Sequence, residues 1–175
     1  MGGLLKIVLT GPESSGKSLL GRSLADFFNA RYIPEYARIH LESEGPDYDY
    51  EALQELSKLH LDYQNKNLRQ GEGLFFLDTD LINYLVWQKL VYGKHDPWLD
   101  KMIAEEADHR YLITAPDIPW EPDPLRENPS DRERIFEAHL QEIEKLKRNY
   151  RVVRGTGEER FTNAVAAVRS LLQGQ

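Results

Sequence analysis

The chain has 175 residues, of which 41% are hydrophobic and 29% are charged, so it is long enough to bury a core of its own as one globular domain. Its 29 acidic residues outnumber its 22 basic ones, and the formal net charge of −7 disfavours nonspecific nucleic-acid binding, which needs a cationic surface. The absence of cysteine excludes disulfides, thiolate zinc sites and thiol catalysis. The apolar runs are too short to span a membrane. Together with the charge, this leads us to expect a cytoplasmic protein that binds neither nucleic acid nor membrane.

Short apolar runs alternate along the chain with longer amphipathic ones. The apolar runs predict strands at 4–10, 31–34, 74–78, 110–114 and 150–154. The segments between them predict helices at 17–29, 50–70, 80–92, 97–108, 130–149 and 158–172. At the start of the 130–149 helix, Ser130 and Glu133 have the spacing of a capping box. Strands separated by helices indicate parallel pairing, so we expect an α/β three-layer sandwich with a five-stranded parallel sheet, formed by one domain over 1–175.

Residues 11–18, GPESSGKS, separate the first strand from the first helix and fit the phosphate-loop pattern G-x-x-x-x-G-K-[ST]. Glycines let the backbone curl so that successive N–H groups point at an anion, and the following helix adds its positive end. We expect Lys17 to reach the β- and γ-phosphates of ATP and Ser18 to bind Mg2+. The alternative is a Gly/Ser turn before a helix. The predicted nucleotide contacts are Gly11, Glu13, Ser14, Ser15, Gly16, Lys17 and Ser18.

Two acids follow the third predicted strand, LFFLD at 74–78. An acid at the end of such a strand helps to hold magnesium in phosphate-loop proteins, and this favours Asp78 as the second magnesium residue. The alternative is that Asp78 or Asp80 caps the next helix, and both interpretations can be partly true.

Glu35, Tyr36 and Arg38 follow the second predicted strand. Ligands bind at the carboxyl ends of strands in open α/β sheets, so Glu35 and Arg38 are expected opposite the phosphate loop, where a phosphate acceptor must lie. A carboxylate there can deprotonate a hydroxyl, and an arginine can hold phosphate or polar substrate groups. The alternative is a surface ion pair at a helix start.

The proline-rich stretch 116–129 and the residues after it predict a functional loop, a lid or substrate loop at about 116–134. Arginines neutralise charge in phosphoryl transfer, and at most two of Arg126, Arg132 and Arg134 are expected to touch phosphate. The alternative is a solvated face of mixed charge. Trp120 is the tryptophan that we expect near the substrate, and the five histidines have no spacing typical of a metal site.

Several motifs occur together in one order: GPESSGKS, EYAR at 35–38, FFLDTD at 75–80, PDIPW at 116–120, PLRENPSDRE at 124–133 and VVRGTGEER at 152–160. In this the chain resembles the bacterial ribosylnicotinamide kinase family, the kinase half of the bifunctional NadR-type proteins. The resemblance covers nearly the whole chain and implies a phosphate-loop kinase fold. It also implies that ATP with Mg2+ phosphorylates nicotinamide riboside to the mononucleotide. The H-x-G-H signature of the adenylyltransferase domain is absent, so neither that activity nor a repressor role is expected.

The same resemblance implies roles for individual residues. Lys17 and Ser18 would hold phosphate and magnesium, and Glu35, Asp78 and Asp80 would surround the acceptor ribose. Arg126 and Arg132 would belong to the lid, and the segment 155–160, with Gly155 and Arg160, would border the adenine.

The leading hypothesis is therefore a small-molecule kinase in which a ribose 5′-hydroxyl attacks the γ-phosphate of ATP, with either Glu35 or Asp80 as the base. Nicotinamide riboside carries a pyridinium cation, and an acidic cleft edged by Glu35, Asp80, Tyr36 and Trp120 would suit it, as it would a neutral nucleoside. The alternatives are a nucleotide-dependent switch or an oligomeric ATPase module without an acceptor, or a kinase for another nucleoside. The sequence leaves open the oligomeric state and the choice between ATP and GTP.

Overall fold

The computed structural model describes residues 4–45, 48–121 and 130–174. Its strands form a parallel sheet of five in the order β2-β3-β1-β4-β5, with β1 at the centre. The strands are β1 (Leu5–Thr10), β2 (Arg31–Ile33), β3 (Leu74–Asp78), β4 (Arg110–Thr114) and β5 (Tyr150–Val153). All five lie where the sequence predicts them, and the expected parallel α/β class is confirmed.

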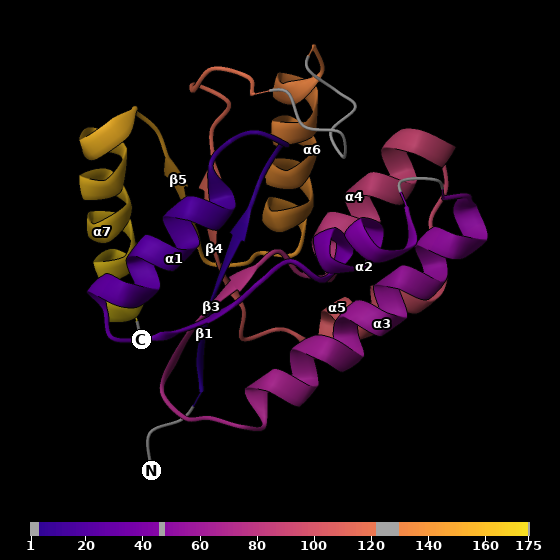
Figure 1. The fold of residues 1–175 in the computed structure, drawn as a ribbon, viewed down its shortest axis with the longest axis horizontal. Helices are drawn as coiled ribbons and strands as arrows, with labels where there is room; N and C mark the ends of the chain where they lie inside the picture. The colour runs from indigo at the N-terminus through magenta and orange to yellow at the C-terminus, as the bar shows by residue number, and fades with distance from the viewer. Residues whose placement is uncertain (1–3, 46–47, 122–129, 175) are drawn as a thin grey trace.

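Helices cover both faces of the sheet, which gives three layers (Figure 1). The helices are α1 (Lys17–Phe27), α2 (Tyr36–Glu44), α3 (Tyr50–Leu68), α4 (Leu81–Tyr92), α5 (Pro97–Glu105), α6 (Arg132–Lys145) and α7 (Gly157–Gln173). Helices α1 and α7 pack on one face, and α2 to α6 pack on the other.

The central strand shows why the chain folds this way. Ile7 and Leu9 of β1 belong to the cluster under α1 and α7, whereas Val8 belongs to the cluster under the other helices. All three are fully buried, as a strand covered on both faces requires. The carboxyl ends of the strands therefore meet at one edge, from which the phosphate loop and the segments after β2, β3, β4 and β5 all emerge.

Three details differ from the sequence predictions. The helix α2 was not predicted, because Ala37 is its single buried residue and its sequence has no strong apolar stripe. The predicted capping box is wrong as well: α6 is capped at Asp131 rather than Ser130, without a side-chain capping hydrogen bond. The helix also ends at Lys145, before Lys147, whose φ of 54° is left-handed.

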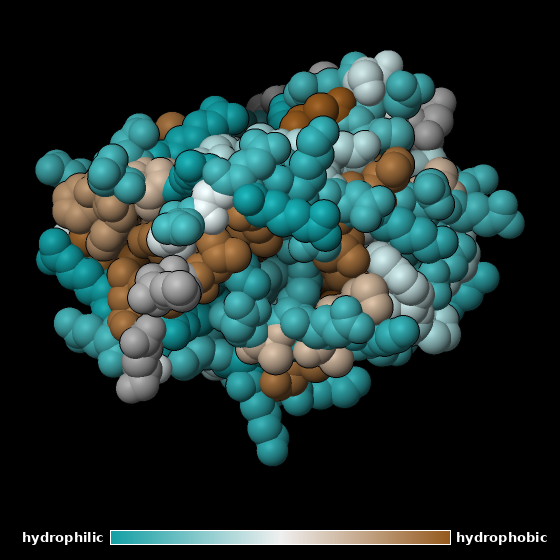
Figure 2. Space-filling view, turned by 90° about the horizontal axis from the view of Figure 1, so that it is seen from below, coloured by the Kyte–Doolittle hydropathy of each residue, from teal (hydrophilic) through white to brown (hydrophobic). Residues whose placement is uncertain are grey.

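The face of the molecule seen from below is mostly hydrophilic, with brown apolar patches between teal side chains (Figure 2). Across the described part of the chain, every helix is too short or too polar to cross a membrane.

Candidate functional site

The phosphate loop curls between β1 and α1, and two glycines permit this path. Gly16 has a φ of 79° and Gly11 a φ of 132°, both in the region that side chains disfavour. A Cβ on Gly11 would also lie 2.7 Å from the Thr114 carbonyl oxygen of β4. The Ser15 hydroxyl, 2.7 Å from the Pro12 carbonyl oxygen, closes the loop internally. The loop is thus a shaped backbone turn, as the motif predicts.

Lys17 begins α1 and turns its ammonium back over the loop. Its Nζ donates to the Gly11 and Pro12 carbonyl oxygens at 3.1 and 2.7 Å. The positive charge therefore stands beside the N-terminal end of α1, whose dipole favours the same anionic ligand.

Arg160, from the start of α7, holds the loop from behind. Arg160 is 6% exposed, and its guanidinium donates to the Ser15 carbonyl oxygen at 2.7 Å and to the Ala115 carbonyl oxygen at 3.0 Å. It also pairs with Asp117 at 2.6 Å, and the same carboxylate accepts the Gly155 N–H at 2.8 Å. Arg160 and Gly155 therefore support the loop and its neighbouring strand ends, and neither lines the cleft described below.

Of the expected loop arginines, Arg132 also binds main chain. It donates to the Ser14 carbonyl oxygen at 3.2 Å and the Ile118 carbonyl oxygen at 2.9 Å, and its guanidinium lies 6.0 Å from the Trp120 ring centroid. Trp120 thus packs beside Arg132 and is not among the residues that line the cleft, whereas Arg134 is. The predicted lid residue Arg126 lies outside the described residues.

Ser18 and Asp78 meet at the expected magnesium position. The Ser18 hydroxyl donates to Asp78 Oδ2 at 2.6 Å, and the Tyr32 hydroxyl donates to the same oxygen at 2.6 Å. Asp78 Oδ1 is buried and has no hydrogen-bond partner among the described atoms. An oxygen donor set with one unused carboxylate oxygen fits Mg2+, which prefers carboxylate, hydroxyl and water oxygens. Tyr32 was missed in the sequence, where it is one aromatic residue in a short strand.

A cleft of about 550 Å³ opens beside the loop, within the range of small-molecule sites. It runs between the loop, α2, α4 and the start of α6. Its lining includes Gly11, Glu13, Ser14, Ser15, Gly16, Lys17, Ser18, Glu35, Arg38, Tyr48, Asn83, Trp87, Arg134 and His139. The predicted loop residues and the predicted Glu35 and Arg38 are therefore brought to one cavity.

Glu35 occupies the N-cap position of α2 and faces this cavity. Burial and the negative charge of Asp78 raise its pKa to about 7, against the opposing charges of Lys17 and Arg38. A carboxylate with a pKa near 7 suits proton transfer at neutral pH. Arg38 also forms an exposed ion pair with Glu42, one turn further along α2, at 3.1 Å. Tyr36 instead packs against Tyr63, with tilted rings whose centroids are 5.2 Å apart, and does not line the cavity.

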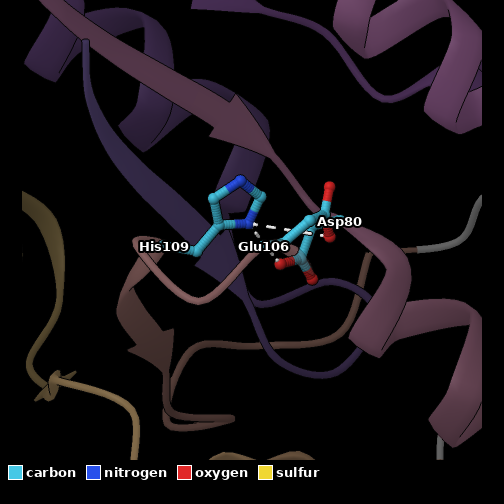
Figure 3. Close-up of side chains that lie close together, drawn as sticks. All are labelled: Asp80, Glu106 and His109. Atoms are coloured by element: carbon cyan, nitrogen blue, oxygen red, sulfur yellow. Dashed lines mark hydrogen bonds and ion pairs between the residues drawn. The ribbon is translucent and has the colours of Figure 1, made fainter. Parts of the chain in front are cut away.

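Asp80 takes the alternative role of helix cap. Its Oδ1 accepts the Ile82 N–H at 3.0 Å, and its Oδ2 accepts the Tyr111 hydroxyl at 2.7 Å and lies 2.9 Å from His109 Nδ1. Figure 3 shows the side chains of Asp80, His109 and Glu106 close together, and all three residues are buried. The carboxylate is fully buried and does not line the cleft, so the structure keeps Glu35, and not Asp80, within reach of a ligand there.

Electrostatics of this buried cluster agree with a structural ion pair. Burial alone would lower the pKa of His109, but the hydrogen bond to Asp80 and the charge of Glu106 outweigh it and raise that pKa. The same hydrogen bond and charge of His109 lower the pKa of Asp80 despite its burial. Asp80 is therefore ionised, but its lowered pKa makes it a weak proton acceptor, and its oxygens are already bonded to His109, Tyr111 and the Ile82 N–H.

Four cleft residues escaped the sequence reasoning. Tyr48 and Trp87 form an aromatic pair with ring centroids 4.9 Å apart, and the Trp87 N–H donates to the Tyr48 hydroxyl at 2.9 Å. Asn83 and His139 face each other from α4 and α6 at 3.2 Å. The only signal in the sequence was the helical spacing of Asn83 and Trp87, four residues apart, and such spacing is more typical of packing.

Comparison with known proteins places the chain among phosphate-binding domains. A family model described as an AAA domain matches residues 6–160. The curated trifunctional NAD biosynthesis/regulator proteins NadR of Escherichia coli (strain K12) and Salmonella typhimurium (strain LT2) are each 27% identical over 177 residues. The match covers 97% of this chain and 43% of each relative, so the chain spans less than half the length of the curated relatives it matches.

Solved structures share the fold. A crystal structure of NadR protein in complex with NR superposes with a TM-score of 0.81 at 24% identity, over 95% of this chain and 49% of that one. NadR protein in complex with NAD and AMP-PNP gives 0.78 at 23% identity, with the same coverage. Thymidylate kinase from Ehrlichia chaffeensis gives 0.66 at 14% identity, over 98% of this chain and all of that one. These matches establish a phosphate-loop kinase-like fold.

Proposed function

Because the chain belongs to the AAA domain family and is homologous to the NadR proteins, we propose that it is an ATP-dependent kinase that phosphorylates the 5′-hydroxyl of nicotinamide riboside to give nicotinamide mononucleotide. The observation that carries this proposal is that Lys17, the phosphate loop and Glu35 line one cleft, and that the pKa of the Glu35 carboxyl is raised to about 7.

The nucleotide half of the reaction belongs to the loop. Its N–H groups and the start of α1 receive the phosphates of ATP, and Lys17 places an ammonium against the charge that develops on the transferred group. Ser18 and the free Oδ1 of Asp78 are the residues that would hold Mg2+. When bound, the ion neutralises charge on the β- and γ-phosphates. Tyr32 keeps the other Asp78 oxygen in place through its hydroxyl.

The acceptor half belongs to Glu35. Phosphoryl transfer depends mainly on positioning and on charge stabilisation, and the base needs only to accept the hydroxyl proton as the bond to phosphorus forms. Glu35 accepts that proton at the N-cap of α2, where its raised pKa makes it a competent acceptor near pH 7. Arg38 and Arg134 line the same cavity and supply positive charge around the transferred phosphate.

The substrate assignment draws on the aromatic wall of the cleft. Trp87 has the ring type that attracts cations most strongly, and its bond to Tyr48 fixes its orientation. A pyridinium ring against Trp87, with its ribose toward Glu35, would use two residues that line the same cavity. The NadR relatives are named for NAD biosynthesis, and one solved NadR structure contains NR. A cytoplasmic location, a single domain over 1–175 and a lid at about 116–134 stay predictions.

The test is a product assay with ATP, Mg2+ and a panel of nucleosides. We expect one ADP per nicotinamide mononucleotide, with nicotinamide riboside preferred, and loss of turnover in Lys17→Met but not in Lys58→Met, which changes an exposed lysine of α3. No mononucleotide from nicotinamide riboside would remove the substrate assignment. ADP release without any acceptor would instead favour the alternative, a phosphate-loop ATPase or nucleotide-dependent regulatory module.

A further inference from the structure

Asn83 and His139 form a hydrogen-bonded pair on the wall of the cleft, between α4 and α6. His139 is 2% exposed, and its Nδ1 lies 2.8 Å from the Ile135 carbonyl oxygen of its own helix. Its other nitrogen, Nε2, lies 3.2 Å from the side-chain amide of Asn83. Both residues line the cavity.

The protonation of His139 follows from these two contacts. A carbonyl oxygen can only accept, so Nδ1 must carry a hydrogen. Burial and the positive charge of Lys17 lower the pKa of His139 to about 4, against the Ile135 hydrogen bond and the charge of Asp80. The ring is therefore neutral near pH 7, and Nε2 carries a lone pair and no hydrogen.

That lone pair fixes the orientation of the amide. The Asn83 atom facing Nε2 is assigned as Oδ1, but two acceptors cannot share a hydrogen bond. The oxygen and nitrogen of an amide exchange places by a half-turn, and the hydrogen-bonding partners determine which end faces which group. The NH2 group of Asn83 must face His139, and its oxygen must face the cavity.

We propose that Asn83 presents its side-chain oxygen to the cleft and there accepts a hydrogen bond from a sugar hydroxyl of the phosphoryl acceptor, so that it selects acceptors bearing that hydroxyl. This inference rests on the proposed function and deepens it. Asn83 lies one turn before Trp87 on α4, and both residues line the cavity. The sugar of a nucleoside whose ring packs on Trp87 would lie beside Asn83, one helical turn away.

The first test needs no substrate. Long-range 1H–15N spectra of the full chain at pH 7 separate protonated from bare ring nitrogens, and the His139 signals are assigned by their loss in His139→Gln. We expect a hydrogen on Nδ1 and none on Nε2. A hydrogen on Nε2 would mean that the Asn83 oxygen faces His139 and its NH2 group faces the cavity. That result would overturn the proposal, whatever the activity of the protein.

The second test measures kcat/KM for nicotinamide riboside and its 2′-deoxy and 3′-deoxy analogues. The wild-type protein should discriminate against one analogue by roughly three- to tenfold, the effect of one net hydrogen bond. The discrimination should disappear in Asn83→Leu and persist in Asn83→Asp, which retains an oxygen toward the cleft. Asn163→Leu, the same substitution at an exposed position of α7, is the control.

Equal discrimination in the wild-type protein and Asn83→Leu, or its loss in Asn83→Asp alone, would overturn the proposal. If no nicotinamide nucleoside is phosphorylated, the proposed function is wrong, and so is the selection of acceptors by their hydroxyl group. The histidine spectrum then still tests the amide orientation by itself, so the two failures are distinguishable.

Discussion

Replacing Glu35 with glutamine should stabilise the folded protein at pH 8 while removing its proposed catalysis. The folded state raises the pKa of Glu35 from 4.5 to about 7. Relative to the variant, the free energy of unfolding of the wild-type protein is therefore highest below about pH 4.5, and it falls as the pH rises through about 7. Since one pKa unit corresponds to about 1.4 kcal/mol, a rise from 4.5 to about 7 sets the upper limit of the penalty at high pH between about 3 and 4 kcal/mol. The side chain faces an open cleft, so we expect about 1–2 kcal/mol.

The assay is thermal and urea denaturation of the wild-type protein and Glu35→Gln at pH 5 and pH 8. A gain of about 1–2 kcal/mol corresponds to about 3–6 °C in Tm for a chain of this size, and it should appear at pH 8 and shrink at pH 5. In parallel, kcat/KM of the wild-type protein should rise with pH through about 7, and the variant should lose about 100-fold or more.

Glu44→Gln is the matched control, because it removes the same charge from an exposed position of the same helix. It should leave the stability difference between the two pH values and the pH profile unchanged. Equal Tm values for the wild-type protein and Glu35→Gln at pH 8 would contradict the raised pKa of Glu35. A kcat/KM that does not change between pH 6 and 8 would contradict its role as the base.

Three further substitutions test the supports of the site. Gly21→Ala would normally favour a helix, but the added Cβ would lie 2.7 Å from the Tyr32 ring. Urea denaturation should therefore show a free energy of unfolding lower by about 1–3 kcal/mol, and a gain in stability would contradict the close packing. Arg160→Met should raise the KM for ATP and destabilise the fold by about 3 kcal/mol, because three main-chain carbonyls and a carboxylate lose a buried partner. ATP titration and denaturation check both effects. Asp80→Asn should lower the free energy of unfolding by about 3 kcal/mol through the loss of the ion pair with His109, while the folded protein keeps its turnover. A hundredfold fall in kcat at unchanged stability would instead make Asp80 the base.

The elements with strong local patterns could be predicted from the sequence. Each strand is a short apolar run, and the phosphate loop is a contiguous motif whose glycines adopt the left-handed backbone it requires. The helix α2 lacks such a pattern, because only Ala37 is buried and the helix is held by its neighbours. Local sequence carries little information on an element of that kind.

The roles of the two candidate bases could not be separated from sequence. Glu35 and Asp80 both follow a strand and both precede a helix. What distinguishes them is the surroundings of each carboxylate: Asp80 meets His109 and Tyr111, 29 and 31 residues later in the chain, whereas Glu35 faces the cavity. The aromatic pair of Tyr48 and Trp87 could not be predicted for the same reason. These residues become partners only when α4 packs beside the segment before α3.

The contact between Arg160 and the Ser15 carbonyl joins positions 145 residues apart. During synthesis the motif at 11–18 is made 145 residues before the guanidinium that braces it. A growing polypeptide therefore carries the whole nucleotide signature before it has a braced anion-binding loop, and affinity for ATP should arise only once α7 has been made and has docked.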